Sequence, residues 1–297
     1  MTPVLFAGLV FAWGFTWYAI KLQIGPVPME ASICYRFIVA ALVMWGWLAA
    51  TGRLKRARPA QHLWFALMGV SLFGLNFVLV YEATQYIASG VVSVLFSAAT
   101  VFNAFNQWAF MGKRPTARVL AGAALGIAGI ALLFEADFAE MEMAATVPLG
   151  IALALGGTFV FSLGNLVSLR AARGGLDLPN VVARGMSWGA AFLALLVLVR
   201  GRGFGIELTP EYLLSLLYLA IPGSVLAFLA YLTLVGRVGA DRAAYATVLF
   251  PVVALTVSTM LEGYVWTPAA IAGLPLILLG NLVIFAPPLR RRAARTA

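Results

Sequence analysis

Residues 101–134 read VFNAFNQWAFMGKRPTARVLAGAALGIAGIALLF, two apolar blocks joined by a short basic turn. Shifted by 151 residues, this stretch aligns with residues 252–285, which read VVALTVSTMLEGYVWTPAAIAGLPLILLGNLVIF. Identical pairs include Val101/Val252, Gly112/Gly263, Thr116/Thr267, Ala121/Ala272, Gly122/Gly273, Gly129/Gly280 and Phe134/Phe285. The first turn carries Lys113 and Arg114, whereas the second carries Glu262. The chain therefore contains an internal repeat whose two copies have opposite charge at equivalent turns.

The composition around this repeat is that of a membrane protein. Of the 297 residues, 63% are hydrophobic and only 10% are charged, and the mean hydropathy is +0.97. Soluble domains average about 45–50% apolar and about 25% charged residues. A soluble globule of this size could not cover so much apolar surface, and the same figures exclude a disordered chain, a coiled coil and collagen. The sequence predicts an integral membrane protein.

Ten apolar blocks are long enough to cross a bilayer, which takes about 20 residues per helix. They span roughly 3–22, 29–50, 62–82, 86–111, 117–134, 147–170, 179–200, 211–234, 242–263 and 268–287. A membrane barrel would instead show alternating segments of about ten residues. We therefore predict an all-α protein of ten transmembrane helices.

The ten predicted helices divide into two units of five. The first unit covers residues 1–140, the second covers 147–287, and a basic tail, 288–297, follows. Since five is odd, the second unit inserts upside down relative to the first, which agrees with the charge reversal between the two turns. Inverted repeats place a binding site near the membrane midplane and suit alternating access.

The basic residues predict the orientation in the membrane. The face that holds both termini and every second loop carries 15 of the 20 Lys and Arg residues. Because Lys and Arg are enriched on the cytoplasmic side, both termini are expected in the cytoplasm. The tail residues 290–292, all Arg, resemble a nucleic-acid patch, but they directly follow a span, so contact with anionic lipid headgroups is the better interpretation.

Enzyme chemistry finds little support in the sequence. Cys34 is the single cysteine and His62 the single histidine, which leaves no disulfide framework, no cysteine zinc site and no Ser/His dyad. We expect no metal, no cofactor and no catalytic residue. The expected partners are a small-molecule substrate and the lipid bilayer, without nucleic acid. The sequence leaves the oligomeric state open, and a monomer is compatible with it.

Several short motifs resemble those of a known family. They are Trp13-Gly14 followed by Lys21, Arg36-Phe37 with Ala40 and Leu42, and Met111-Gly112 running into Leu120-Ala121-Gly122 and Gly126-Ile127-Ala128-Gly129. These residues resemble the drug/metabolite transporter superfamily, EamA type, and within it most of all the YddG-type aromatic amino-acid exporters. The resemblance implies a ten-helix exporter of the bacterial inner membrane.

Polar and aromatic residues within the predicted spans are candidates for a substrate site, because polar groups in a membrane are costly. Helices one and six begin the two units, so their middles are expected to meet near the midplane. The candidates are Trp13, Trp17, Asn76, Asn103, Gln107, Ser162 and Asn165. The alternative is that the aromatic rings pack in the core and that the amides join helices by hydrogen bonds.

Two arginines lie a few residues inside spans of the two units. Arg36 belongs to the second predicted helix and Arg184 to the seventh. Either could snorkel to the headgroups or pair structurally, and either could bind a substrate carboxylate with its planar fork.

Small residues and a proline mark candidate hinges. Gly156, Gly157 and Gly164 lie in the sixth predicted helix, and Pro222 and Gly223 lie in the eighth. Proline removes a helical hydrogen bond and glycine tolerates unusual dihedrals, so bending here would serve alternating access. The alternative is that these small residues allow close helix packing.

The acidic residues narrow the substrate class. Glu30, Glu82 and Glu262 lie at span ends, and no Asp or Glu falls in the middle of a predicted span. A proton-driven cation exporter would need a buried carboxylate. We therefore expect an exporter of amino acids by alternating access, with aromatic ones favoured and other neutral ones included; the alternative is an exporter of other small metabolites or of drugs and cations.

Overall fold

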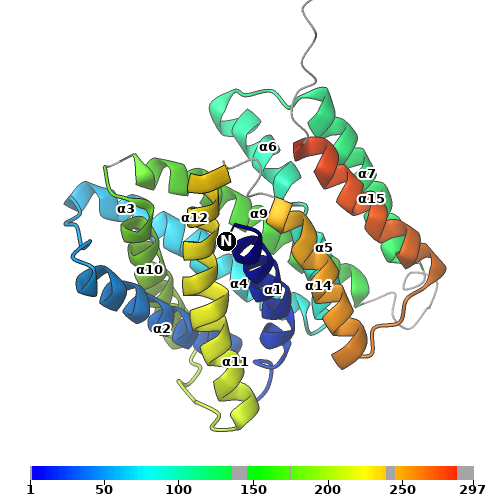
Figure 1. Cartoon of the computed structure of the whole chain (residues 1–297). Coiled ribbons are helices and arrows are strands. Elements are labelled where there is room, and N and C mark those ends of the chain that lie inside the picture. The colour runs from blue at the N-terminus through cyan, green and yellow to red at the C-terminus, as the bar shows by residue number, and fades with distance from the viewer. Residues whose placement is uncertain (1, 136–145, 174, 239–244, 286–297) are drawn as a thin grey trace, which may run out of the picture.

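The computed structural model describes residues 2–135, 146–173, 175–238 and 245–285, and every regular element in these ranges is a helix (Figure 1). The first half contains α1 (Thr2–Lys21), α2 (Met29–Ala50), η1 (Pro59–Gln61), α3 (His62–Met68), η2 (Gly69–Leu75), α4 (Asn76–Ala83), α5 (Ser89–Phe96), α6 (Ala99–Met111) and α7 (Ala117–Leu133). The second half contains α9 (Val147–Ala172), α10 (Leu178–Val199), α11 (Pro210–Ala220), η4 (Ile221–Leu226), α12 (Ala227–Val238), α14 (Tyr245–Leu261) and α15 (Pro268–Phe285).

Eight of these helices, some built from consecutive segments, are long and apolar enough to cross a membrane. Two further apolar helices, α7 and α14, have 17 residues each. The prediction of an all-helical, multi-pass membrane protein is therefore confirmed, whereas the count of ten spans stays a prediction. The basic tail 288–297, most of the acidic linker (136–145) and the start of the predicted span 242–263 lie outside the described residues.

The turns that end the fourth and ninth predicted spans have the same geometry in both halves. Gly112 and Gly263, which the sequence shift pairs, adopt φ values of 69° and 71°. The amide of the following residue bonds back across the turn in each case, from Lys113 to the Gln107 carbonyl at 3.3 Å and from Tyr264 to the Ser258 carbonyl at 3.2 Å. A left-handed glycine just past a helix end is what this C-terminal cap requires.

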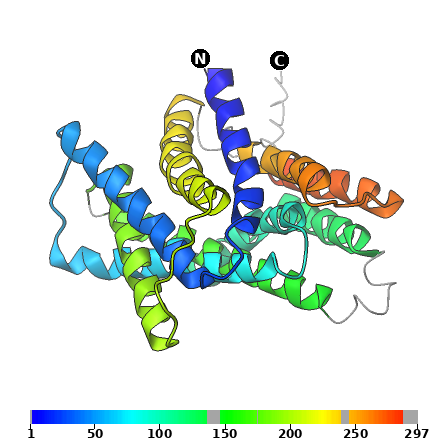
Figure 2. The ribbon, with the colours of Figure 1, turned by 90° about the horizontal axis from the view of Figure 1, so that it is seen from below.

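The contact between α7 and α15 reflects the repeat directly. A Cβ on Gly122 would lie 2.5 Å from the Gly280 carbonyl oxygen, and one on Gly129 would lie 2.6 Å from the Gly273 carbonyl oxygen. The shift pairs Gly122 with Gly273 and Gly129 with Gly280. Gly122 therefore packs against the counterpart of Gly129, and Gly129 packs against the counterpart of Gly122. Two antiparallel copies related by a two-fold axis produce this crossed pattern. Figures 1 and 2 show α7 and α15 side by side at one edge of the bundle.

Three of the spans contain irregular backbone. The third and eighth predicted spans include π-helical segments, η2 and η4, at positions that the shift of 151 residues also brings into register. Pro222 lies in η4 and offers no amide hydrogen, and the Ser224 hydroxyl donates to the Leu219 carbonyl at 2.8 Å. π-Helical turns within α-helices often mark functional sites.

The predicted span 86–111 is not one continuous helix. The structure has two helices, α5 and α6, separated by a turn at Ser97 and Ala98. The Ser97 hydroxyl and the Ser97 amide both donate to the Val94 carbonyl, at 2.6 Å and 3.1 Å, so a side chain shares a backbone acceptor at the break. The sequence has neither proline nor glycine at this point, which is why a single helix was expected.

Candidate substrate-binding site

A cavity of about 590 Å³ lies between the two halves of the bundle. Its walls come from α1, α2, η2, α4, α5, the α5–α6 break, α6 and α7 in the first half, and from α9, η4, α12, α14 and α15 in the second. The interruptions at Ser97 and at Gly223 both face this space. The irregular backbone of two spans is thus placed where it borders a cavity, the setting in which membrane proteins tolerate it.

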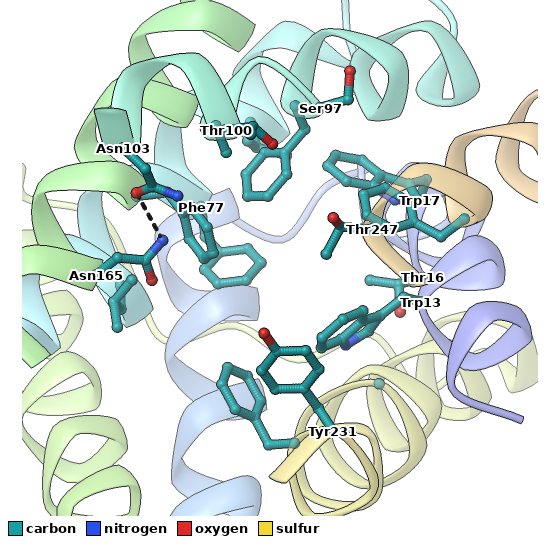
Figure 3. Close-up of a pocket in the computed structure, with 18 of the residues that line it drawn as sticks. Trp13, Thr16, Trp17, Phe77, Ser97, Thr100, Asn103, Asn165, Tyr231 and Thr247 are labelled. Carbon is teal, nitrogen blue, oxygen red and sulfur yellow. Dashed lines mark hydrogen bonds between the residues drawn. The ribbon is translucent and has the colours of Figure 1, made fainter. Parts of the chain in front are cut away.

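Aromatic rings form one side of the cavity, as Figure 3 shows for Trp13, Trp17 and Tyr231. The rings of Trp13 and Tyr231 have centroids 5.6 Å apart. The Trp17 ring stacks on Phe250 at 5.9 Å with an interplanar angle of 15°. Trp13 and Trp17 are one helical turn apart in α1, so a single face of that helix presents both. This wall can hold an apolar group by burial and stacking.

Amide side chains lie on the opposite side, where Asn103 and Asn165 face each other (Figure 3). Asn165 donates to the Asn103 side-chain oxygen at 3.3 Å, and the Ser162 hydroxyl donates to the same oxygen at 2.9 Å. Asn106 in turn donates to the Ser162 hydroxyl at 2.9 Å. Ser162 is buried behind the wall, where it links the cavity-lining Asn103 to the buried Asn106.

A polar stripe of α6 faces the cavity. Thr100, Asn103 and Gln107 lie at positions i, i+3 and i+7 of this helix, on one face, and all three line the cavity. Asn76, by contrast, is 1% exposed and does not belong to the lining. Its neighbour Phe77 borders the cavity instead. Neither end of the Asn76 amide has a hydrogen-bond partner among the described residues.

The two arginines are in different places. Arg36 is buried and borders the cavity, where its Nε donates to the Ser224 hydroxyl at 3.2 Å. Arg184 lies next to a separate surface pocket with Trp45 and donates to the Asn180 carbonyl at 2.9 Å. Only Arg36 is therefore positioned to meet a molecule in the cavity.

The candidate hinge residues also differ in their surroundings. Gly156, Gly157 and Gly164 lie within α9, which runs as an α-helix without interruption. A Cβ on Gly164 would lie 2.6 Å from Leu72, a distance that reflects close packing. Pro222 and Gly223 instead lie at the start of η4, and Gly223 borders the cavity.

Sequence reasoning missed several residues of the wall. Phe77 and Phe228 both line the cavity, and the shift of 151 residues pairs them, so the repeat could have identified them. The further lining residues that were not expected include Ser97, Ser224, Tyr231, Thr247 and Phe250. No local motif distinguishes these side chains from other residues of apolar helices.

The cavity extends toward the end of the bundle that carries the basic Lys113–Arg114 turn. Val119 in the first turn of α7, Thr247 in that of α14 and Phe285 at the end of α15 all line it. Hydrogen bonds between elements lie at the other end. Gln23 donates to the Ser215 hydroxyl at 2.6 Å, and the Lys21 ammonium donates to the Thr84 carbonyl at 2.9 Å.

Comparisons with known proteins agree with this architecture. Residues 2–135 and 148–286 match the model of a family described as the EamA-like transporter family. An uncharacterized transporter of Bacillus subtilis, YvbV, is 26% identical over 93% of this chain and 89% of its own length. A probable amino-acid metabolite efflux pump of Salmonella typhimurium is 27% identical over 96% of this chain and 95% of its own.

Two further similarities extend over nearly the whole chain. A probable terminal-alkyne amino-acid exporter of Streptantibioticus cattleyicolor is 28% identical over 97% of this chain and 94% of its own length. A solved crystal structure of 18% sequence identity superposes with a TM-score of 0.66 over 95% of this chain and 96% of that one. At this identity the structural likeness concerns the fold alone.

Proposed function

Because the chain belongs to the EamA-like transporter family, we propose that it exports amino acids and related small metabolites, with aromatic ones favoured, by alternating access. The observation that carries this proposal is the cavity of about 590 Å³ between the two halves, with Trp13, Trp17 and Tyr231 on one side and Asn103 and Asn165 on the other. Ligand sites for small molecules commonly have volumes of about 300–1,000 Å³.

The walls suit an amphipathic substrate. Trp13, Trp17 and Tyr231 offer flat apolar surfaces for a side chain, and offset aromatic contacts contribute about 0.5–1.5 kcal/mol beyond the buried area. Asn165 and Gln107 offer donors and acceptors to polar groups that would otherwise lose their hydration. The names of the similar Salmonella and Streptantibioticus proteins, an efflux pump and an exporter for amino-acid compounds, point to the same class of substrate.

The direction in which the cavity extends supports a state that loads substrate from the cytoplasm. The basic turn at Lys113 and Arg114 belongs on the cytoplasmic side by the positive-inside rule. With that orientation in a bacterial inner membrane, the cavity reaches toward the cytoplasm and the contacts of Gln23 and Lys21 close the outer end. Export then requires those contacts to open while the cytoplasmic end closes.

A drug or cation exporter is the second candidate function, and the cavity favours it less. Among the described residues that line the cavity there is no Asp or Glu to attract a cation or exchange it for a proton. Glu30 and Glu262 lie at helix ends and are engaged there, Glu30 with Arg200 and Glu262 with Ser89 and Ser258. Neutral, zwitterionic or anionic molecules fit the cavity better.

Flux through purified protein in liposomes tests the proposal. Vesicles loaded with unlabelled phenylalanine should accumulate labelled phenylalanine faster than protein-free vesicles, and tryptophan and leucine should compete. Cationic dyes should compete weakly. If no amino acid moves or competes while a cationic dye does, the chain is a drug or cation exporter and the proposal is wrong.

A further inference from the structure

The charge of the cavity is unbalanced. Among its described lining residues, Arg36 is the only one with a charged side chain. Arg36 is 2% exposed, so its guanidinium is almost entirely removed from water. A buried charge without a counter-ion is costly, and proteins normally pair it or present it to a ligand. A group with negative charge is therefore the natural complement of this cavity.

The surroundings of Arg36 leave part of its hydrogen-bonding capacity unused. The Nε group donates to the Ser224 hydroxyl at 3.2 Å, but Nη1 is buried and has no hydrogen-bond partner among the described residues. The guanidinium carbon lies 4.4 Å from the centre of the Phe77 ring and 5.2 Å from that of Phe37. These rings hold the cation in place, but they accept no conventional hydrogen bond.

Arg184 shows how the same protein treats an arginine that has a structural role. Its Nη1 group donates to the Asn180 carbonyl at 2.9 Å and to the Asn180 side-chain oxygen at 3.1 Å, and Nη2 donates to the Lys55 carbonyl. Arg36 has fewer acceptors: its Nε donates to the Ser224 hydroxyl and the Tyr81 hydroxyl lies beside its guanidinium, but Nη1 has no partner among the described residues. We infer from this contrast that an acceptor reaches Arg36 from the cavity.

An apolar wall connects Arg36 with the rest of the cavity. Phe37 contacts Phe73 at 5.3 Å between ring centres, Phe73 contacts Phe228 at 6.0 Å, and Phe228 contacts Trp13 at 6.3 Å. A molecule with its anionic group at Arg36 would lay its apolar part along these rings. No comparable charge is offered to an ammonium group, and the Asn103 oxygen already accepts two hydrogen bonds.

We propose that Arg36 binds the carboxylate of the substrate and that the cavity accepts amphipathic organic monoanions, so that the α-ammonium group of an amino acid is dispensable. A guanidinium and a carboxylate match in shape and charge. Deaminated and N-acylated aromatic acids are then substrates alongside the amino acids, whereas the amines that lack a carboxylate are not. This inference rests on the proposed transport through the same cavity.

A ligand series on the unmodified protein tests this. Uptake into proteoliposomes is compared for phenylalanine, N-acetylphenylalanine, hydrocinnamate and phenethylamine, with protein-free vesicles correcting for passive entry. We expect N-acetylphenylalanine and hydrocinnamate to enter at least as fast as phenylalanine, and phenethylamine to enter no faster than the background. If phenylalanine is transported but both anions without an ammonium are not, the inference is wrong and the proposed function stands. If none of the four is transported, the proposed function fails with it.

Substitutions then assign the effect to Arg36. Arg36→Gln should reduce uptake of N-acetylphenylalanine by about tenfold to a hundredfold, the range expected for a lost hydrogen bond to a charged group. Arg36→Lys should retain part of it, because the charge stays and the fork is lost. Arg202→Gln, which removes an exposed arginine outside the cavity, is the matched control and should leave uptake unchanged. Full uptake by a folded Arg36→Gln variant would overturn the assignment; if that variant does not fold, Arg36→Lys and the ligand series decide.

Discussion

Trp17 provides a test of the aromatic wall at the scale of one residue. The ring stacks on Phe250 and meets Phe96 edge-on, with ring centres 5.3 Å apart. Trp17→Ala removes this surface, so we expect uptake of phenylalanine to fall by about twofold to tenfold, the equivalent of one aromatic contact. Uptake of alanine should fall less. Initial rates in proteoliposomes at matched protein content measure both.

Trp108→Ala is the control for that substitution. Trp108 is 47% exposed on α6, pairs with Phe105 and does not line the cavity. The Trp108→Ala substitution removes the same type of side chain without changing the cavity wall, so uptake should stay at the parental rate. Equal losses of phenylalanine and alanine uptake in both variants would show that the effect of Trp17 is structural.

Asn165 and Ser162 belong to one hydrogen-bonded cluster but should differ in what they control. Asn165→Ala leaves the Asn103 oxygen bonded to Ser162, so transport should fall while the midpoint of thermal unfolding changes little. Ser162→Ala removes the group that joins Asn103 and Asn106, and it should lower stability by about 0.6 kcal/mol or more. Thermal unfolding in detergent and phenylalanine uptake separate the two. An Asn165→Ala variant with parental uptake would place Asn165 among purely structural residues.

The sequence could indicate some residues of the cavity but not others. Trp13 and Trp17 in α1 and the Thr100–Asn103–Gln107 stripe in α6 were recognisable because polar or tryptophan side chains are unusual in the middle of a span. Phe77 and Phe250 were not, since phenylalanine is ordinary in any membrane helix. Which of two arginines faces the cavity depends on tertiary packing, which no local pattern around Arg36 or Arg184 encodes.

At the scale of elements, η4 is the proposed place of bending. Pro222 prevents a regular helical hydrogen bond in the interior of the eighth predicted span, at a cost of about 3 kcal/mol in an ordinary helix. Pro222→Ala would permit a regular α-helix from α11 into α12. We therefore expect a higher midpoint of thermal unfolding together with a several-fold slower uptake. Faster or unchanged uptake would argue against bending at this element.

The glycines of α9 allow the second hinge proposal to be tested without a steric clash. A Cβ on Gly156 would have only one neighbour, Leu79, at 3.8 Å, whereas one on Gly164 would lie 2.6 Å from Leu72. Gly156→Ala should be tolerated structurally, so slower uptake in that variant would indicate that α9 bends. Gly164→Ala should lower the unfolding midpoint because the extra methyl group is forced against its neighbours. Parental stability of Gly164→Ala would contradict the close packing seen there.

Element boundaries followed from hydropathy, but breaks within elements did not. The blocks around α2 and α10 predicted those helices almost to the residue, because loops with charge or glycine flank them. The sequence did not predict the turn at Ser97, because serine and alanine are common within membrane helices. The π-helical segment η2 has glycines at both Gly69 and Gly74 but no proline, and such glycines also serve packing. Tertiary contacts decide whether such glycines lie in a π-helical segment or only allow close helix packing.

For the whole molecule, the repeat links topology to mechanism. The two left-handed glycines after α6 and α14, the segments η2 and η4 and the crossed glycines of α7 and α15 all recur under one sequence shift. Two copies that pack around a common axis can exchange conformations. The conformation that closes the cavity at one membrane face in one copy can then close it at the opposite face in the other copy. This exchange works only if the copies are inverted in the membrane.

The inverted arrangement predicts where two reporter fusions lie. Ala144 falls in the acidic linker between the repeats and Arg295 in the basic tail, both outside the described residues. Five spans before Ala144 and ten before Arg295, with the N-terminus in the cytoplasm, put the first in the periplasm and the second in the cytoplasm. Alkaline phosphatase, which is active only when exported, should be active after Ala144 and inactive after Arg295, and green fluorescent protein should show the reverse. If both positions report the same compartment, the second unit contains an even number of spans, and the copies cannot be related by inversion.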